Sequence, residues 1–287
     1  MQKTPYPTGN NVLTQPTSGS YRMFRITDIP DVMEKKEGWP VGAAMMRRWF
    51  NSPAYTMSED VKAGRTGPAI LSPDRIDESI ITMKWARKYQ RFNSAYHALL
   101  NGSWMTTPGI KTLRKCVLQS KPSPIHKQWR LGNLALAGKY LDEICQVNYV
   151  PVGNLNDPLD DFYAALGQCN LKIAVTGVVT ESNGGHKIVI DEVGLYIRDT
   201  YDFNDGWFPF SQPLGFWGFD GVERSIQLAW DVEVDERYSD EPEPAGRKYA
   251  VQNDDFRNYR ARYGRGGDFV VFSDVQRVQI NPITIDL

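Results

Sequence analysis

The residues best suited to chemistry form a carboxylate-rich cluster at the end of a long β-prone run. Asp199, Tyr201, Asp202, Asn204 and Asp205 lie at or just after the end of IVIDEVGLYIR. Ionisable side chains at a strand end, beside a loop, are common components of functional sites. Two neighbouring carboxylates can bind Mg²⁺, or one can stay protonated as a general acid while the other is charged. Asp and Asn are also ordinary turn formers, so the cluster has a structural interpretation as well.

The geometry of this cluster depends on a bend in the chain. In a regular strand, Asp199 and Tyr201 share one face and Asp202 points to the other. The residues at 203–206, Phe-Asn-Asp-Gly, favour a turn that would bring the carboxylates together. We therefore predict Asp199, Tyr201 and Asp202 as catalytic residues. Asp199 and Asp202 are the candidate ligands of Mg²⁺, and either arrangement suits attack at a phosphate ester.

A second candidate group is a run of arginines near the C-terminus. Arg257, Arg260 and Arg265 precede or adjoin the glycine pair 266–267. Guanidinium forks suit phosphate and pyrophosphate, and a glycine turn can expose backbone N–H groups to an anion. We predict these three arginines, together with Asn204, as substrate-binding residues. The alternative is a charged helix face followed by a hairpin turn.

An aromatic-rich loop follows the carboxylate cluster. It contains Trp207, Phe208, Phe210, Phe216 and Trp217. These side chains either belong to the core or form a surface that holds a lipid tail or a partner.

The elements before residue 150 are predicted to be mainly helical. Pro40 begins a helix that runs to Phe50, and Ser72 caps a long helix whose apolar stripe ends near Gly102. Thr107-Pro108 and Ser123-Pro124 repeat the cap-then-proline signature and predict two more helices, and Asp157-Pro158 predicts one closed by Gly167.

After residue 167 the hydrophobic period becomes two. Residues 171–180 and 186–199 flank a glycine turn and predict a hairpin. The apolar phase slips at Asp191-Glu192, which predicts a bulge. Runs 225–234 and 269–280 are further β candidates, and Asn253 begins a short helix closed by Gly264. The predicted fold is α+β: a helical N-terminal half and a mostly antiparallel β C-terminal half, as a curved sheet or half-barrel.

Composition limits the class of protein. Of the 287 residues, 41% are hydrophobic, which is enough to form a core. The net charge of -1 argues against attraction of the whole molecule to nucleic acid. The three cysteines are too scattered for a disulfide framework or a metal site. The N-terminus has no signal-peptide pattern, and no apolar run is long enough to span a bilayer. We predict a flexible tail at 1–20, a helical region at 21–150 and a β-rich region at 151–287 that contains the candidate catalytic residues.

Two resemblances bear on function. Asp199-x-Tyr201-Asp202 resembles the D-x-Y-D signature of the colicin M family, bacteriocins that cleave the peptidoglycan precursor lipid II with Mg²⁺. The family pattern continues with a His-Arg pair, whereas Phe208 and Pro209 stand near that place here. His186 or an arginine from elsewhere in the chain is a candidate replacement for the missing base.

The second resemblance covers most of the chain. The runs at 24–50, 193–205, 212–217 and 253–274 are similar to a proteobacterial family encoded beside type VI secretion spike and PAAR genes. This resemblance implies synthesis in the cytoplasm, export by that machine, a spike or PAAR partner, a cognate immunity protein and action in the periplasm of a target cell.

Together these observations give three functional hypotheses. The first is an antibacterial effector that hydrolyses a phosphoester in a lipid-linked envelope precursor such as lipid II, with Mg²⁺ as cofactor and no nucleic-acid partner. The second is a non-enzymatic adaptor of the secretion apparatus or a membrane-disrupting toxin. The third is a nuclease toxin.

Overall fold

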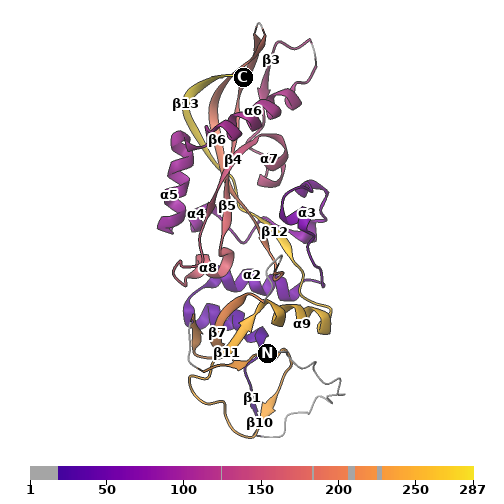
Figure 1. Cartoon of the computed structure of the whole chain (residues 1–287), viewed down its shortest axis with the longest axis vertical. Coiled ribbons are helices and arrows are strands. Elements are labelled where there is room, and N and C mark those ends of the chain that lie inside the picture. The colour runs from indigo at the N-terminus through magenta and orange to yellow at the C-terminus, as the bar shows by residue number, and fades with distance from the viewer. Residues whose placement is uncertain (1–18, 124, 183, 206–210, 225–227) are drawn as a thin grey trace.

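A long antiparallel hairpin runs along the upper part of the molecule (Figure 1). The computed structural model describes residues 19–287 except 124, 183, 206–210 and 225–227. The hairpin consists of β5 (Cys169–Ser182) and β6 (Gly185–Tyr201). Thr176 pairs with Glu192 and Gly177 pairs with Ile190, so Asp191 is the extra residue of a bulge. The hairpin and its bulge are both confirmed.

A seven-stranded sheet is built around this hairpin. Its order is β2-β12-β6-β5-β3, while β13 also pairs with β6 and β4 also pairs with β5. The β2–β12 ladder is parallel and the others are antiparallel. The added strands are β2 (Ile76–Asp77), β3 (Gln128–Leu131), β4 (Gln146–Val152), β12 (Phe269–Phe272) and β13 (Gln276–Asp286). The sheet is curled, and the predicted α+β class with a half-barrel is confirmed.

The N-terminal half supplies most of the helices. Within it, α2 and α6 confirm the helices predicted at Pro40 and Thr107. The helices are α1 (Ile29–Val32), α2 (Pro40–Asn51), α3 (Glu59–Lys62), α4 (Met83–Ala86), α5 (Gln90–Ala98), α6 (Thr107–Ser120), α7 (Gly138–Ile144), α8 (Asp161–Leu166) and α9 (Asn253–Tyr263). Over the described residues, no helix has both the length and the apolar character needed to cross a bilayer.

A smaller four-stranded sheet lies at the other end of the molecule, with α2, α8 and α9 between it and the hairpin (Figure 1). Its order is β8-β7-β11-β9, and β1 pairs separately with β10. The strands are β1 (Tyr21–Arg22), β7 (Pro213–Gly218), β8 (Gly221–Glu223), β9 (Trp230–Asp231), β10 (Tyr238–Ser239) and β11 (Tyr249–Gln252).

The long helix predicted from Ser72 is wrong. Ile76 and Asp77 form β2 instead, and shorter helices follow at α4 and α5. Asp77 is buried, and its carboxylate pairs with Arg48 at 3.0 Å. That carboxylate also accepts hydrogen bonds from the backbone N–H groups of Ser79 and Ile80. Pairing with β12 and this buried ion pair outweigh the local helical preference.

The prediction of a helix from Ser123 is also wrong, and some other elements are shorter than predicted. Trp129 and Leu131 alternate inward on β3, which pairs with β5, and α7 begins only at Gly138. The run 225–234 retains only β9, with 225–227 outside the described residues. The predicted tail lies outside the described range as far as residue 18. All three cysteines are free and buried.

An aromatic cluster joins the two halves of the chain below the end of β6. Phe203 stacks on Phe256 with ring centroids 3.7 Å apart, and Trp49 meets Phe203 edge-on at 4.9 Å. These rings come from the turn after β6, from α9 and from α2. Their packing fixes the direction in which the chain leaves β6.

Candidate functional site

A cavity opens where β6 ends against the smaller sheet. Its volume is about 550 Å³. Apolar side chains form much of its wall. They come from α1, from α2, from residues adjacent to these helices and from β7: Ile29, Met33, Trp39, Met46, Leu214 and Trp217. Polar side chains lie together along the end of β6 and the following turn: Asp199, Thr200, Tyr201, Asp202 and Asn204. The predicted catalytic residues therefore share one cavity.

β6 ends at Tyr201, and residues 202–205 after it have no regular secondary structure. Tyr201 pairs with Phe269 of β12, and Asp199 pairs with Val271. The Asp202 carboxylate accepts a hydrogen bond from the backbone N–H of Asn204 at 3.1 Å. Because Asp202 lies outside the strand, it can line the same cavity as Asp199, although strand alternation alone would place them on opposite faces. Part of the predicted turn, Gly206, lies outside the described residues.

Asp199 is the most perturbed acid of the site. Burial raises the pKa of its carboxyl well above the ordinary value of 3.8, and the charge of Asp202 raises it further. The backbone N–H of Thr200 and the Arg198 guanidinium oppose this shift. The side chain is half-buried and its accessible surface faces the cavity. Burial therefore favours the protonated form of Asp199, and the side chain lines the cavity where a bound molecule would lie.

Asp202 differs from Asp199 because it has a cationic partner. Lys62 Nζ lies 3.0 Å from Asp202 Oδ1, with the two side chains 15% and 11% exposed. Burial disfavours the Lys62 ammonium, but the attraction of Asp202 and hydrogen bonds to Asp202 and Glu59 raise its pKa overall. Lys62 and Asp202 therefore form a recessed ion pair beside Asp199.

Tyr201 is held by stacking. Its ring lies on Phe269 with centroids 5.2 Å apart and meets Phe203 edge-on at 5.5 Å. Burial raises the pKa of its hydroxyl, so Tyr201 remains a hydrogen-bond donor at any physiological pH.

Asn204 and Arg260 converge on a buried carboxylate behind the cavity. Asp268 is fully buried and accepts a hydrogen bond from Asn204 Nδ2 at 2.8 Å and from Trp49 Nε1 at 3.0 Å. Arg260 pairs with Asp268 and also donates to the Gly266 carbonyl at 2.7 Å. Asn204 still lines the cavity, whereas Arg260 does not.

The other two predicted arginines also lie outside the cavity lining. Arg257 donates to the Phe203 carbonyl at 2.8 Å and pairs with Asp205 at 2.5 Å. Arg265 donates to the Asn51 carbonyl at 2.8 Å. These arginines fix the turn and α9 in place. Of the described residues, the one arginine or lysine in the lining is Arg224, which sequence reasoning missed.

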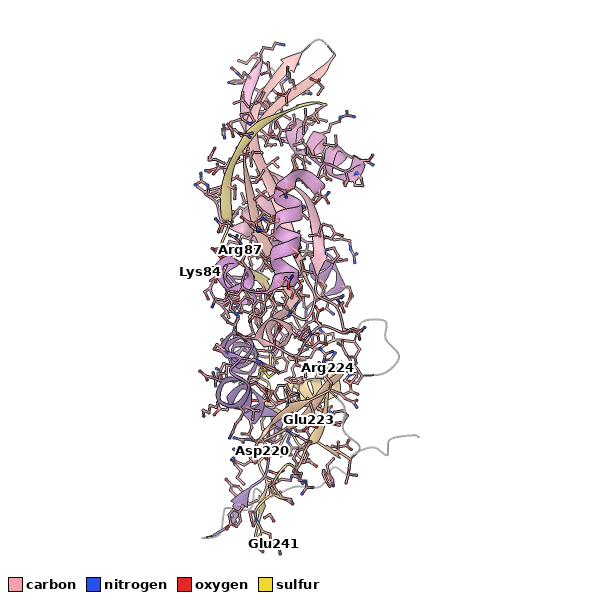
Figure 2. All side chains as sticks on the ribbon, turned by 90° about the vertical axis from the view of Figure 1, so that its left-hand side faces the viewer. Lys84, Arg87, Asp220, Glu223, Arg224 and Glu241 are labelled. Atoms are coloured by element: carbon pink, nitrogen blue, oxygen red, sulfur yellow. The ribbon has the colours of Figure 1, made fainter. Side chains whose placement is uncertain are left out.

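Arg224 follows β8 and contacts the loop before α8. Its guanidinium donates to the Leu155 carbonyl at 2.9 Å and lies over the Tyr163 ring at 4.8 Å. Figure 2 shows Arg224 next to Glu223 partway along the long axis of the molecule. No sequence pattern distinguished Arg224 from other surface arginines.

The replacement for the missing His-Arg pair does not come from His186. That residue lies near the start of β6, beside Trp129 of β3, whereas Asp199 lies near the other end of the strand. At about 3.3 Å per residue, the two are tens of ångströms apart. Among the described residues, a basic side chain that contacts the motif is that of Lys62, at the end of α3.

The donor set fits Mg²⁺ poorly. Metal-binding carboxylates must be ionised, whereas burial disfavours the ionised form of Asp199 and Asp202 already has an ammonium partner. Among the described residues, no three His, Cys, Asp or Glu side chains gather around a common point that could hold a metal ion. The chemistry is therefore assigned to side chains alone.

Asp199→Asn is expected to raise stability at neutral and alkaline pH. The folded state holds the Asp199 proton more tightly than the unfolded chain does. The contribution of Asp199 to the free energy of unfolding is therefore complete below pH 3.8 and is lost as the pH rises through the folded-state pKa. The variant's advantage in unfolding free energy should grow by at most about 1.4 kcal/mol per pH unit over that window. Urea unfolding at several pH values measures it. A gap that does not change with pH would contradict a raised pKa.

The chain matches one protein family over most of its length. A family model described as "Family of unknown function (DUF6402)" matches residues 24–287. No curated protein and no solved structure matches the chain. The matched region includes every residue that lines the cavity, and it also includes Lys62. The chain therefore belongs to this family of unknown function, DUF6402.

Proposed function

We propose that the cavity is the active site of a hydrolase that cleaves a phosphoester in a lipid-linked envelope precursor such as lipid II. The observation that carries the proposal is that two carboxyl groups in different environments line one wall of the cavity: Asp199, whose pKa burial raises, and Asp202, which pairs with Lys62. Two acids whose environments push their protonation states apart are typical of acid-base catalysis.

The proposed roles follow from the different environments of the two carboxyl groups. Water attacks the phosphorus, and Asp202 accepts the proton that this water loses. The bond between phosphorus and the lipid oxygen breaks, and Asp199 donates its proton to that oxygen. The Tyr201 hydroxyl donates a hydrogen bond to a phosphate oxygen. Proton return from Asp202 to Asp199 through solvent restores the starting state.

The wall composition supports the substrate class. Apolar side chains from α1, α2 and β7 suit a hydrocarbon chain, and a cavity of about 550 Å³ accommodates several isoprene units. Arg224 provides a positive charge for phosphate. The arginines predicted for pyrophosphate are engaged elsewhere, so Arg224 replaces them in the proposal.

The delivery route belongs to the same proposal. Resemblance to proteins encoded beside spike and PAAR genes supports export by a type VI machine, action in the target periplasm and neutralisation by an immunity protein. Secretion dependent on the spike genes of the native host tests this part independently of the chemistry.

The test of the chemistry uses expression in the bacterial periplasm. The native chain is expected to cause lysis, and Asp199→Ala and Asp202→Ala are expected to abolish it at equal protein levels. Purified protein should release the polyprenol from lipid II, with the same dependence on both residues. Lysis that both substitutions leave unchanged would reject this site, and toxicity restricted to the cytoplasm with loss of DNA or RNA would indicate a nuclease.

A non-enzymatic function is the second candidate. The extent of apolar wall, with Arg224 as the one cation among the described lining residues, also suits binding of an apolar ligand or of a segment from a spike protein. Spike binding that survives Asp199→Asn, without turnover of lipid II, would favour the adaptor.

A further inference from the structure

We infer that Lys62 is the resident cation of the D-x-Y-D site, so that chemistry there proceeds without Mg²⁺. The part that concerns turnover rests on the proposed function. The assignment of the cation itself rests on geometry and is tested separately.

The Lys62 ammonium lies against the motif. Its Nζ is 3.0 Å from Asp202 Oδ1 and 3.1 Å from Glu59 Oε1. The Lys62 and Asp202 side chains are mostly buried, whereas Glu59 is 69% exposed. The ammonium therefore binds Asp202 in a recessed position, where an ion pair is screened less than at the surface.

The position of Lys62 is set by the same strand that carries the motif. Arg198, one residue before Asp199, is buried and donates to the Val61 carbonyl at 2.8 Å and to the Lys62 carbonyl at 3.4 Å. Val61 is itself buried, which anchors α3 against the sheet. The end of β6 therefore holds both the carboxylate and the backbone of the lysine that neutralises it.

A divalent cation at Asp202 would have to approach this ammonium. Like charges within a few ångströms repel strongly in a recessed site, so binding of Mg²⁺ requires displacement of Lys62. The ammonium can perform the electrostatic part of the metal's role through Asp202, because it binds that carboxylate, which lines the cavity, while Lys62 itself does not. It cannot ligate substrate oxygens in the manner of a metal, which leaves that contact to Arg224 and Tyr201.

The first test measures metal binding without reference to activity. Mn²⁺ serves as the probe, by electron paramagnetic resonance of the free ion, with the native chain, Lys62→Met, Lys62→Arg and Asp202→Asn. The native chain and Lys62→Arg should show no Asp202-dependent binding, and Lys62→Met should bind Mn²⁺ at least tenfold more tightly than the native chain. Millimolar or tighter binding by the native chain that Asp202→Asn removes would overturn the inference.

The second test measures turnover of lipid II. EDTA should leave the native rate unchanged, and Lys62→Met should lower kcat at least tenfold with little change in KM, whereas Lys62→Arg should restore most of the rate. Lys139→Met is the matched control. Lys139 lies on α7, its ammonium pairs with Glu78 at 2.7 Å, and it does not line the cavity. A native rate abolished by EDTA and restored by Mg²⁺ would overturn the inference. If no protein turns over lipid II, the proposed function fails, and the Mn²⁺ titration alone decides the role of Lys62.

Discussion

Asp199→Asn is expected to lower the rate of lipid II hydrolysis by about 10²–10⁴-fold, the usual contribution of a general acid. Asparagine keeps the size of the side chain and its hydrogen-bonding capacity, but it cannot transfer a proton to the leaving oxygen. The loss should fall on kcat, because burial favours the uncharged form of the Asp199 carboxyl and the amide is uncharged as well. Release of polyprenol from lipid II under steady-state conditions is the measurement.

The matched control for this prediction is Asp191→Asn on the same strand. Asp191 lies at the bulge and its pair with Arg130 is largely exposed, so the substitution should leave the rate unchanged. Stability of both variants is followed by thermal unfolding at the assay pH. A rate for Asp199→Asn within threefold of the native value, with the fold intact, would remove Asp199 from the mechanism.

Asp268→Ala is expected to destabilise the fold by about 3–5 kcal/mol, as for loss of one partner from a buried ion pair. The carboxylate is fully buried and accepts hydrogen bonds from Trp49 Nε1, from the Met57 N–H at 2.9 Å and from Asn204. Its removal leaves the buried Arg260 without its carboxylate. Urea unfolding at pH 7 measures the change in free energy.

The comparison variants for this prediction separate charge from shape. Asp268→Asn keeps most hydrogen-bond positions and should cost less than Asp268→Ala, while the exposed Asp286→Ala on β13 should change stability by less than about 0.5 kcal/mol. A cost below about 1 kcal/mol for Asp268→Ala would show that neighbouring groups replace its contacts.

Local signals were sufficient where an element is stabilised by its own residues. The helix at Thr107 has a side-chain cap, since Thr106 Oγ1 accepts a hydrogen bond from the Gly109 N–H at 3.2 Å. The phase slip at Asp191 is visible because strand residues alternate strictly, so one extra residue reverses the pattern. The turn at Asp202 and Asn204 likewise depends on neighbours in sequence, which is why the polar wall of the cavity was predictable.

Contacts between distant segments were not predictable in the same way. Ile76 and Asp77 have helical neighbours, and only pairing with β12 makes them a strand. Lys62 contacts Asp202 from a segment that has no hydrophobic periodicity. Asp268, the buried partner of Arg260, directly follows a glycine pair that predicts only a turn. Charge pairing between distant segments cannot be read from a single sequence, so Arg260 was assigned to a ligand and not to Asp268.

The parallel β2–β12 ladder has a consequence for how the chain matures on the ribosome. β2 is synthesised well before the strand beside it, β12. Until β12 emerges, the nascent chain exposes the edge of β2 that β12 pairs with in the folded protein. Completion of the large sheet is thereby postponed until Phe269–Phe272 has been synthesised.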